Sequence, residues 1–252
     1  MARTPSPRSS SPRRVARRSL ATRAVAWSRR AARMAAYVVL ATAILILALR
    51  WAPPPTSMFM LIRHAERLLA TKPGPPILYT WTARTDIPTH VALAVVAAED
   101  QNFPRHFGFD LTAIARAVKY NETHDRMRGA STITQQTVKN LFLWPGRSLV
   151  RKGFEAVLTL AVEVVWPKAR ILEIYLNVAE FGDGTYGVGA AAKRYFGKTP
   201  QKLSRREAAV LASVLPSPRR LHAKQPSSYV NSRAKWVQTQ MRQLGQKHIT
   251  WP

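Results

Sequence analysis

The sequence predicts a mainly α-helical protein in which one transmembrane helix precedes a single helical domain. The first observation behind this prediction is an uncharged apolar run of sixteen residues near the N-terminus, Met34–Leu49. The second is that helix start and stop signals recur from Val91 onward, whereas the alternation typical of strands does not repeat. The chain has 252 residues, enough for one good-sized domain plus an appendage, and no internal repeat is evident.

The charge of the chain is strongly positive and unevenly distributed. The formal net charge is +26, and residues 1–65 contain twelve arginines but no lysine or acid. A surface of this kind fits nucleic acid or an anionic membrane with its phosphate-bearing lipids. The absence of cysteine excludes disulfide frameworks, thiolate metal sites and cysteine nucleophiles, and the six histidines lack metal-ligand spacing. Any metal ion is therefore expected to be hard and oxygen-bound, such as Mg²⁺, and no cofactor is assigned.

The N-terminal segment has the features of a membrane anchor. Residues 1–33 are rich in Arg, Ser, Pro and Ala and are predicted to be a disordered tail. Residues 34–51 are a predicted transmembrane helix, with Trp51 suited to the interface and prolines at 53–55 that stop the helix. The positive-inside rule places the tail in the cytoplasm, where attraction to anionic lipids explains its arginines without nucleic acid.

A cleaved signal peptide and a buried core helix are the alternatives for this apolar run. A tail of 33 residues is long for a signal peptide, and no small-x-small cleavage site follows the run. A core helix is not usually flanked by an arginine-rich tail and a triple proline. We therefore expect a single membrane-spanning anchor.

The rest of the chain is divided by helix-capping signals. Asp110 is a predicted N-cap, Ser204 and Glu207 form a predicted capping box, and Gly245 is predicted to stop the last helix. Ser131 and Thr132 are predicted to precede a helix that runs through Leu143. The other predicted helices begin at Val91 or cover Leu111–Tyr120, Leu149–Trp166, Pro167 through Asn177, Ala208–Leu215 and Val230–Leu244.

Glu99 is the first candidate for catalysis. It stands with Asp100 at the end of the apolar run Val91–Ala98, and an aromatic residue, a histidine and a glycine follow at once. An acid held against an apolar wall has its charged form disfavoured, so its pKa rises toward the range useful for proton transfer. Because acids also cap helices, this pattern alone is a weak indication of catalysis. The residues that follow it in the chain make the indication strong.

Two further groups of polar residues follow at helical spacing. Ser131, Gln135 and Lys139 lie at i, i+4 and i+8 and are predicted to share one helix face. A hydroxyl, an amide and an ammonium on one face suit a ligand that combines sugar with phosphate. Arg151 and Glu155 are four residues apart, and by spacing alone an ordinary helix salt bridge is the favoured interpretation.

Five sequence blocks occur in order along the chain. They are Glu-Asp-x-x-Phe-x-x-His-x-Gly from Glu99, Gly-Ala-Ser-Thr-Ile-Thr-Gln-Gln from Gly129, Arg-Lys-x-x-Glu from Arg151, Lys168–Asn177 and Arg206–Leu211. Over roughly residues 80–245 the pattern resembles the peptidoglycan glycosyltransferase domain, glycosyltransferase family 51, of class A penicillin-binding proteins and monofunctional enzymes. The active-site blocks of a transpeptidase are missing as a set, so the chain resembles the monofunctional form.

The resemblance implies a fold and a set of boundaries. The family has a lysozyme-like helical lobe and a smaller membrane-proximal lobe, which falls at about residues 115–150 here. The predicted boundaries are 1–33 for the cytoplasmic tail, 34–51 for the transmembrane helix, 52–80 for a connector, 81–245 for the glycosyltransferase domain and 246–252 for a C-terminal tail.

The resemblance also implies a reaction. The family transfers a growing glycan chain from undecaprenyl pyrophosphate to lipid II, a lipid-linked disaccharide-pentapeptide, with inversion to a β-1,4 link. Glu99 matches the general base that acts on the 4-hydroxyl of the acceptor, and Glu155 matches a second glutamate that assists at the donor. The cations expected to face the leaving pyrophosphate are Arg116, Lys139, Arg147 and Lys152. The other residues expected to bind substrate are Asp100, Ser131, Gln135, Gln136, Arg151 and Asn177.

Partners and location follow from the implied reaction. The expected partners are lipid II and the growing glycan chain, anionic membrane lipids, and proteins of cell-wall synthesis or division, with no nucleic acid. The expected location is the bacterial inner membrane, with a single span, a cytoplasmic N-terminus and a periplasmic catalytic domain. Trp144 at a Pro-Gly turn is predicted to dip into the interface, while Phe142 and Leu143 fit a core helix end equally well.

Two rival functions stay open from the sequence. A lysozyme-like hydrolase uses such a glutamate as general acid on a glycosidic oxygen, but cleavage of glycan needs no cationic pyrophosphate site. A membrane-tethered binder of nucleic acid or another anionic polymer explains the charge and leaves the Glu99 and Gln135-Gln136 blocks unexplained. The G-x-G-x-x-G pattern Gly182–Gly187 lacks the preceding strand that a dinucleotide site requires, so nucleotide binding is not expected.

Overall fold

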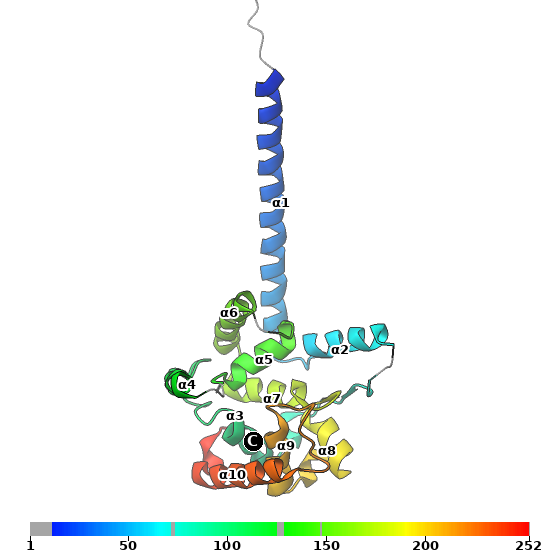
Figure 1. Cartoon of the computed structure of the whole chain (residues 1–252), viewed down its shortest axis with the longest axis vertical. Coiled ribbons are helices and arrows are strands. Elements are labelled where there is room, and N and C mark those ends of the chain that lie inside the picture. The colour runs from blue at the N-terminus through cyan, green and yellow to red at the C-terminus, as the bar shows by residue number, and fades with distance from the viewer. Residues whose placement is uncertain (1–11, 72–73, 125–128, 147, 252) are drawn as a thin grey trace, which may run out of the picture. The chain divides into compact units, whose positions relative to one another are not determined.

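A computed structural model describes residues 12–71, 74–124, 129–146 and 148–251. The chain divides into two compact units, Met1–Ala48 and Leu49–Pro252. The first contains nearly all of helix α1 (Pro12–Leu49), drawn in blue in Figure 1. Its segment Trp27–Leu49 is 23 residues long and apolar enough to cross a membrane. The prediction of one N-terminal spanning helix is therefore confirmed at the level of length and composition.

The predicted disordered tail is helical from Pro12 onward, and its first eleven residues lie outside the described part of the chain. Alanine and arginine are good helix formers, and a helix that already exists extends without the cost of a new nucleus. Composition alone therefore placed the start of the helix too late.

The second unit is built mainly from helices. Its α-helices are α2 (Met58–Leu69), α3 (Thr89–Glu99), α4 (Leu111–Thr123), α5 (Ile133–Phe142), α6 (Leu149–Val165), α7 (Lys168–Val178), α8 (Val188–Phe196), α9 (Arg205–Val214) and α10 (Ser228–Leu244). Short 3₁₀ turns cover Arg84–Asp86, Pro200–Lys202 and Gln246–His248. The mainly α fold class is confirmed, whereas α2 lies inside the segment predicted to be a connector.

The core of the second unit surrounds α3. Every residue from Val91 to Ala97 is buried, because α3 packs against both α9 and α10. Helix α5 packs against α6 and α7, and Figure 1 shows α5 and α6 on one side of α7 with α3, α9 and α10 on the other. The C-terminal end of α3, which carries Glu99, is thereby held between the two groups of helices.

A three-stranded sheet was not predicted. Its order is β1 (Leu78–Tyr79), β3 (Thr185–Tyr186) and β2 (Glu180–Gly182), with β1 parallel and β2 antiparallel to β3. Strands of two or three residues are too short to show an alternating pattern. The sheet ties the segment before α3 to the segment between α7 and α8.

The G-x-G-x-x-G pattern lies on this sheet. A short strand does precede it, contrary to expectation, but its glycines span an antiparallel hairpin and not a strand-helix crossover. Gly187 has φ +82° at the start of α8, and a Cβ there would come within 2.6 Å of the Asn177 carbonyl oxygen. The pattern thus serves a tight turn and a close backbone approach.

The predicted caps are present. The Asp110 side chain accepts from the Ala113 amide at 2.8 Å, and Ser204 and Glu207 form the predicted capping box of α9. Helix α5 has a capping box of its own, made by Thr132 and Gln135. Thr132 also donates through Oγ1 to the carbonyl of Gly108 at 2.7 Å, so one hydroxyl joins α5 to the loop that follows α3.

Thr132→Ala is expected to lower the free energy of unfolding by about 1–2 kcal/mol, because the helix loses its N-cap and Gly108 loses its donor. Urea unfolding of the detergent-solubilised chain, followed by circular dichroism, measures the change. Thr199→Ala is the matched control, since Thr199 is an N-cap residue without a side-chain cap bond, and it should stay within about 0.5 kcal/mol. Equal losses in both variants would contradict the capping role.

Candidate active site

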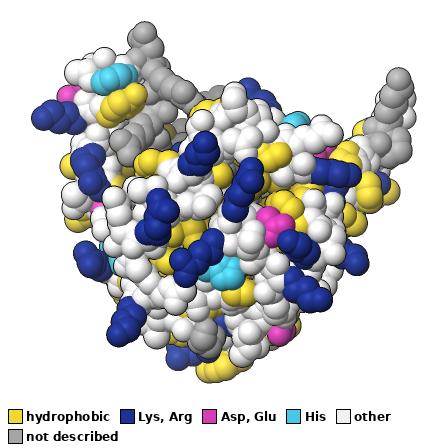
Figure 2. All heavy atoms as spheres, turned by 90° about the horizontal axis from the view of Figure 1, so that it is seen from below, with side chains coloured by type: hydrophobic (Ala, Val, Ile, Leu, Met, Phe, Trp, Pro, Cys, Tyr) yellow, Lys and Arg dark blue, Asp and Glu magenta, His cyan; other side chains and the backbone are white. Residues whose placement is uncertain are grey.

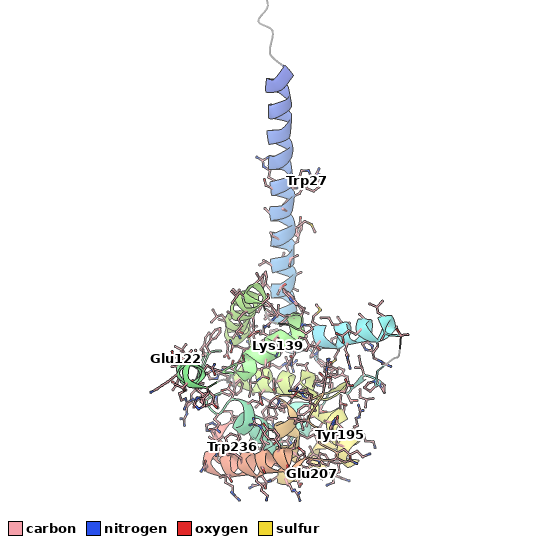
Figure 3. All side chains as sticks on the ribbon, viewed as in Figure 1. Trp27, Glu122, Lys139, Tyr195, Glu207 and Trp236 are labelled. Carbon is pink, nitrogen blue, oxygen red and sulfur yellow. The ribbon has the colours of Figure 1, made fainter. Side chains whose placement is uncertain are left out.

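Glu99 borders a cavity of about 360 Å³ at the end of α3. The wall is formed by the loop after α3, by α4, by the segment before α5 and by α10. The lining residues include Glu99, Asp100, Arg116, Ser131, Trp236 and Gln240. Figure 3 shows Trp236 on α10, which places an aromatic side chain on one side of this first cavity.

The surroundings of the Glu99 carboxylate include groups that raise its pKa and groups that lower it. Burial raises its pKa above the ordinary range and is the largest influence. The amide of Gln136, which donates from Nε2 to Glu99 Oε2 at 2.9 Å, lowers the pKa, as do the charges of Arg233 and Lys139. The neighbouring Asp100 raises it. The net effect is a raised pKa, which suits a group that takes up a proton near neutral pH.

A second cavity, of about 400 Å³, is bordered by Gln136. Its lining includes Phe59, Gln136, Lys139, Asn140, Tyr175 and Arg219. Because Gln136 borders this second cavity and also donates to Glu99, the two cavities approach each other at the Glu99–Gln136 pair.

Lys139 is affected by the charges of both candidate glutamates. Burial lowers its pKa most strongly, the charges of Glu155 and Glu99 raise it, and Arg151 and Lys152 lower it. Its ammonium lies 5.8 Å from the centre of the Phe59 ring. Figure 3 shows Lys139 on α5, in the middle of the second unit. A half-buried cation within electrostatic range of both carboxylates is placed to face a negatively charged ligand.

Glu155 forms a buried ion-pair cluster near the start of α6. Arg151 Nη1 donates to Glu155 Oε2 at 2.6 Å, and Lys152 Nζ donates to Oε1. The helix salt bridge favoured by spacing is therefore present, and a second cation joins it. Arg151 Nε also donates to the Gly146 carbonyl at 3.0 Å, so the cluster fixes the turn before the helix. Arg147, which was predicted to join these cations, lies outside the described residues.

The structure places three predicted site residues differently from what the sequence suggested. Ser131 precedes α5 and does not share a helix face with Lys139, although it lines the first cavity. Gln135 is buried, and its amide completes the capping box. Asn177 is fully buried, and its amide binds the backbone of Thr82 on both sides. The amides of Gln135 and Asn177 are thus engaged in hydrogen bonds within the protein.

Asp100 and Arg116 also differ from expectation. Asp100 borders the first cavity, yet Oδ2 lies 2.9 Å from His106 Nε2 and accepts from the Ile133 amide at 3.0 Å. Its carboxylate is thus engaged in joining the ends of α3 and α5. Arg116 lines the first cavity, whereas Lys139 lines the second, so the structure separates these two predicted pyrophosphate ligands.

Sequence reasoning missed two side chains near Glu99. Arg233 of α10 lowers the pKa of Glu99 and donates to the Ala98 carbonyl at 3.3 Å. The Tyr175 hydroxyl of α7 donates to Gln136 Oε1 at 3.0 Å. Tyr175 belongs to the fourth sequence block and could have been singled out there, whereas no signal marks Arg233.

The described residues offer no protein-made metal site. They contain no group of three or more His, Cys, Asp or Glu side chains that could hold a metal ion. Both oxygens of Glu155 are taken by cationic side chains, and Glu99 accepts from Gln136. These donors do not fit a resident Mg²⁺, so no step below is routed through a metal.

Comparison with known proteins identifies the family. The family described as Transglycosylase matches residues 74–242. Proteins named biosynthetic peptidoglycan transglycosylase are similar to this chain over most of their length. The one from Ectopseudomonas mendocina is 48% identical over 221 residues, which cover 88% of this chain and 91% of that protein.

Two further relatives carry the same name. The protein from Salmonella schwarzengrund is 55% identical over 194 residues, 77% of this chain and 80% of its own length. The protein from Xanthomonas campestris pv. campestris is 52% identical over 205 residues, 81% of this chain and 83% of its own. The matched region contains both glutamates and most of the residues that line the two cavities. The chain therefore belongs to the transglycosylase family as a glycosyltransferase of peptidoglycan synthesis.

Proposed function

We propose that the enzyme polymerises lipid II into β-1,4-linked glycan strands and releases undecaprenyl pyrophosphate. The observation that carries this proposal is the position of Glu99 where two cavities approach each other, with Lys139 in the second. The first cavity suits the sugar of the acceptor, because it offers amides, hydroxyls and the Trp236 ring. The second suits the donor, because its pyrophosphate needs a cation.

Glu99 acts as general base in this proposal. It takes the proton of the acceptor's 4-hydroxyl, and that oxygen attacks the anomeric carbon of the donor. The bond from this carbon to the pyrophosphate breaks, its electron pair leaves with the phosphate, and the configuration inverts from α to β. Lys139 stabilises the negative charge that develops on the leaving group. Glu155 assists by fixing Arg151 and Lys152 beside the donor.

Labelled lipid II distinguishes this proposal from its closest rival. The detergent-solubilised chain is expected to convert lipid II into glycan strands and to leave purified, preformed glycan uncut. Cleavage of preformed glycan without polymerisation would replace the synthase with a lysozyme-like hydrolase, in which Glu99 acts as an acid.

A binder of nucleic acid has weaker support. Figure 2 shows one face of the molecule on which Lys and Arg side chains outnumber acidic ones but stand apart from one another among other residues. A nucleic-acid surface usually gathers its cations into a patch or stripe. The arginine-rich N-terminal segment instead suits the anionic lipids of the cytoplasmic leaflet.

The proposed location is the bacterial inner membrane, with the N-terminus in the cytoplasm and the catalytic domain in the periplasm. Helix α1 is consistent with a membrane anchor, and the lipid tails of both substrates keep them in the bilayer. The active site must therefore stay close to the outer leaflet. Proteins of cell-wall synthesis or division remain proposed partners.

Helix α6 presents the apolar surface that we expect to face lipid. Its exposed apolar side chains are Leu149, Val150, Phe154, Val157, Leu160 and Val164. A row of this size is unusual on a surface that faces only water. Arg50, which lies in the second unit, donates to the Val165 carbonyl at the end of α6. Trp144 is 44% exposed, while Leu143 is buried and belongs to the core.

A cysteine label at Val157 is expected to report contact with lipid. The chain has no native cysteine, so Val157→Cys carries a single environment-sensitive fluorophore. In proteoliposomes, nitroxide-labelled lipids should quench this fluorophore at least about twofold more than the same label at Gln243→Cys, an exposed position on α10. Equal quenching at both positions would exclude α6 as the lipid-facing surface.

A further inference from the structure

Three side chains form a continuous hydrogen-bonded row that ends on the candidate base. The Tyr175 hydroxyl of α7 donates to Gln136 Oε1 at 3.0 Å, and Gln136 of α5 donates from Nε2 to Glu99 Oε2 at 2.9 Å. Tyr175 is only 1% exposed. The row therefore crosses three helices and reaches Glu99 from the protein interior.

While Glu99 is ionised, the protons of this row have only one consistent arrangement. A carboxylate can only accept, so the amide of Gln136 must present its NH₂ group to Glu99. The carbonyl oxygen of the same amide then faces Tyr175, whose hydroxyl can satisfy it only by donating. A tyrosine at one end and a carboxylate at the other thus hold the amide in a single orientation.

Tyr175 keeps its donor proton throughout the working pH range. Burial raises the pKa of its hydroxyl well above the usual value, and the negative charges of Glu99 and Asp100 raise it further. The hydroxyl therefore stays protonated while Glu99 changes its charge. The amide that it holds does not need to rotate during turnover.

We propose that Tyr175 is a positioning residue that acts through Gln136. It holds the amide of Gln136 in a hydrogen bond with Glu99 Oε2, which leaves Glu99 Oε1 to accept the proton from the acceptor hydroxyl. This inference rests on the proposed role of Glu99 as general base. The proton moves from the sugar hydroxyl to Oε1, and the electron pair that it leaves behind forms the new bond to the anomeric carbon. Tyr175 itself touches no reacting atom.

Removing the hydroxyl frees the amide to turn. In Tyr175→Phe, Gln136 can present its carbonyl oxygen to Glu99, an arrangement that favours the protonated acid. The other charged groups around Glu99 are unchanged: Asp100 beside it, Lys139 on α5 and Arg233 on α10. The pKa of Glu99 should therefore rise, and the base form should be lost at a higher pH than in the unsubstituted enzyme.

The experiment measures kcat and KM for lipid II against pH with the full chain in detergent. For Tyr175→Phe we expect the acid limb of kcat/KM to move upward by about 0.5–1 pH unit and kcat to fall about 3- to 30-fold, with KM changed less than about twofold. Tyr229→Phe is the matched control, because Tyr229 is an exposed tyrosine on α10, and its profile should match the unsubstituted enzyme. A folded Tyr175→Phe enzyme with an unmoved acid limb would overturn the proposal.

A double substitution tests whether Tyr175 acts through the amide. Once Gln136→Leu has removed the amide, adding Tyr175→Phe should lower kcat by no more than about 1.5-fold further. If the reduction of kcat in the double variant equalled the product of the two single reductions, Tyr175 would act independently of Gln136. That result would contradict the inference. Full polymerisation by Glu99→Gln would instead show that the general-base assignment has failed, so the two failures can be told apart.

Discussion

Replacing Glu99 with glutamine is expected to lower the rate of lipid II polymerisation by at least about a hundredfold. Glutamine keeps the size of the side chain but cannot take the proton of the acceptor hydroxyl. The change also removes a charge from a site where burial already opposes it, so the fold should tolerate the substitution. The measurement is the initial rate of glycan formation from labelled lipid II at saturating substrate.

The control for this prediction is Glu122→Gln. Glu122 is an exposed acid on α4, and Figure 3 shows it away from Lys139 and Trp236. The control variant should polymerise lipid II within about twofold of the unsubstituted rate. Retention of most of the activity by Glu99→Gln, with Glu122→Gln unaffected, would assign the base to another group.

Lys139→Met is expected to lower kcat by about 10²- to 10³-fold, comparable to the loss of one preorganised donor to a developing negative charge. Methionine keeps the apolar length of the side chain and removes its ammonium. The effect should be large because Lys139 is half-buried and lies within electrostatic range of both glutamates, where water screens it poorly. Single-turnover rates with a glycan donor that still carries its undecaprenyl pyrophosphate separate this effect on chemistry from an effect on binding.

Lys139→Arg and Lys119→Met complete this test. The arginine keeps the charge and should retain more activity than the methionine, although its planar group does not reproduce the ammonium geometry. Lys119 is an exposed lysine on α4, and its replacement should leave the rate within about twofold. If Lys139→Met were as active as Lys119→Met, the pyrophosphate would have to bind away from the second cavity.

The sequence by itself determined the features that depend on near neighbours. The caps at Asp110 and Ser204 could be predicted because each one joins atoms only three residues apart. The apolar run up to Ala98 indicated a buried helix with an acid at its end, and α3 has this form. The spanning helix and the family blocks are likewise readable from contiguous residues.

Only the tertiary structure decided which polar side chains meet. Gln135 and Gln136 are adjacent in the chain, but the first closes the cap of α5 and the second binds Glu99. Asn177 lies in a family block and yet is buried against the segment before α3.

The remaining partners were beyond the reach of sequence patterns for the same reason. Arg233 reaches the end of α3 because α10 packs on that helix, and Tyr175 reaches Gln136 because α7 packs on α5. Helical spacing determines which residues share a helix face. The packing of separate helices determines which side chains that face contacts. Helix packing depends on contacts between residues far apart in the sequence.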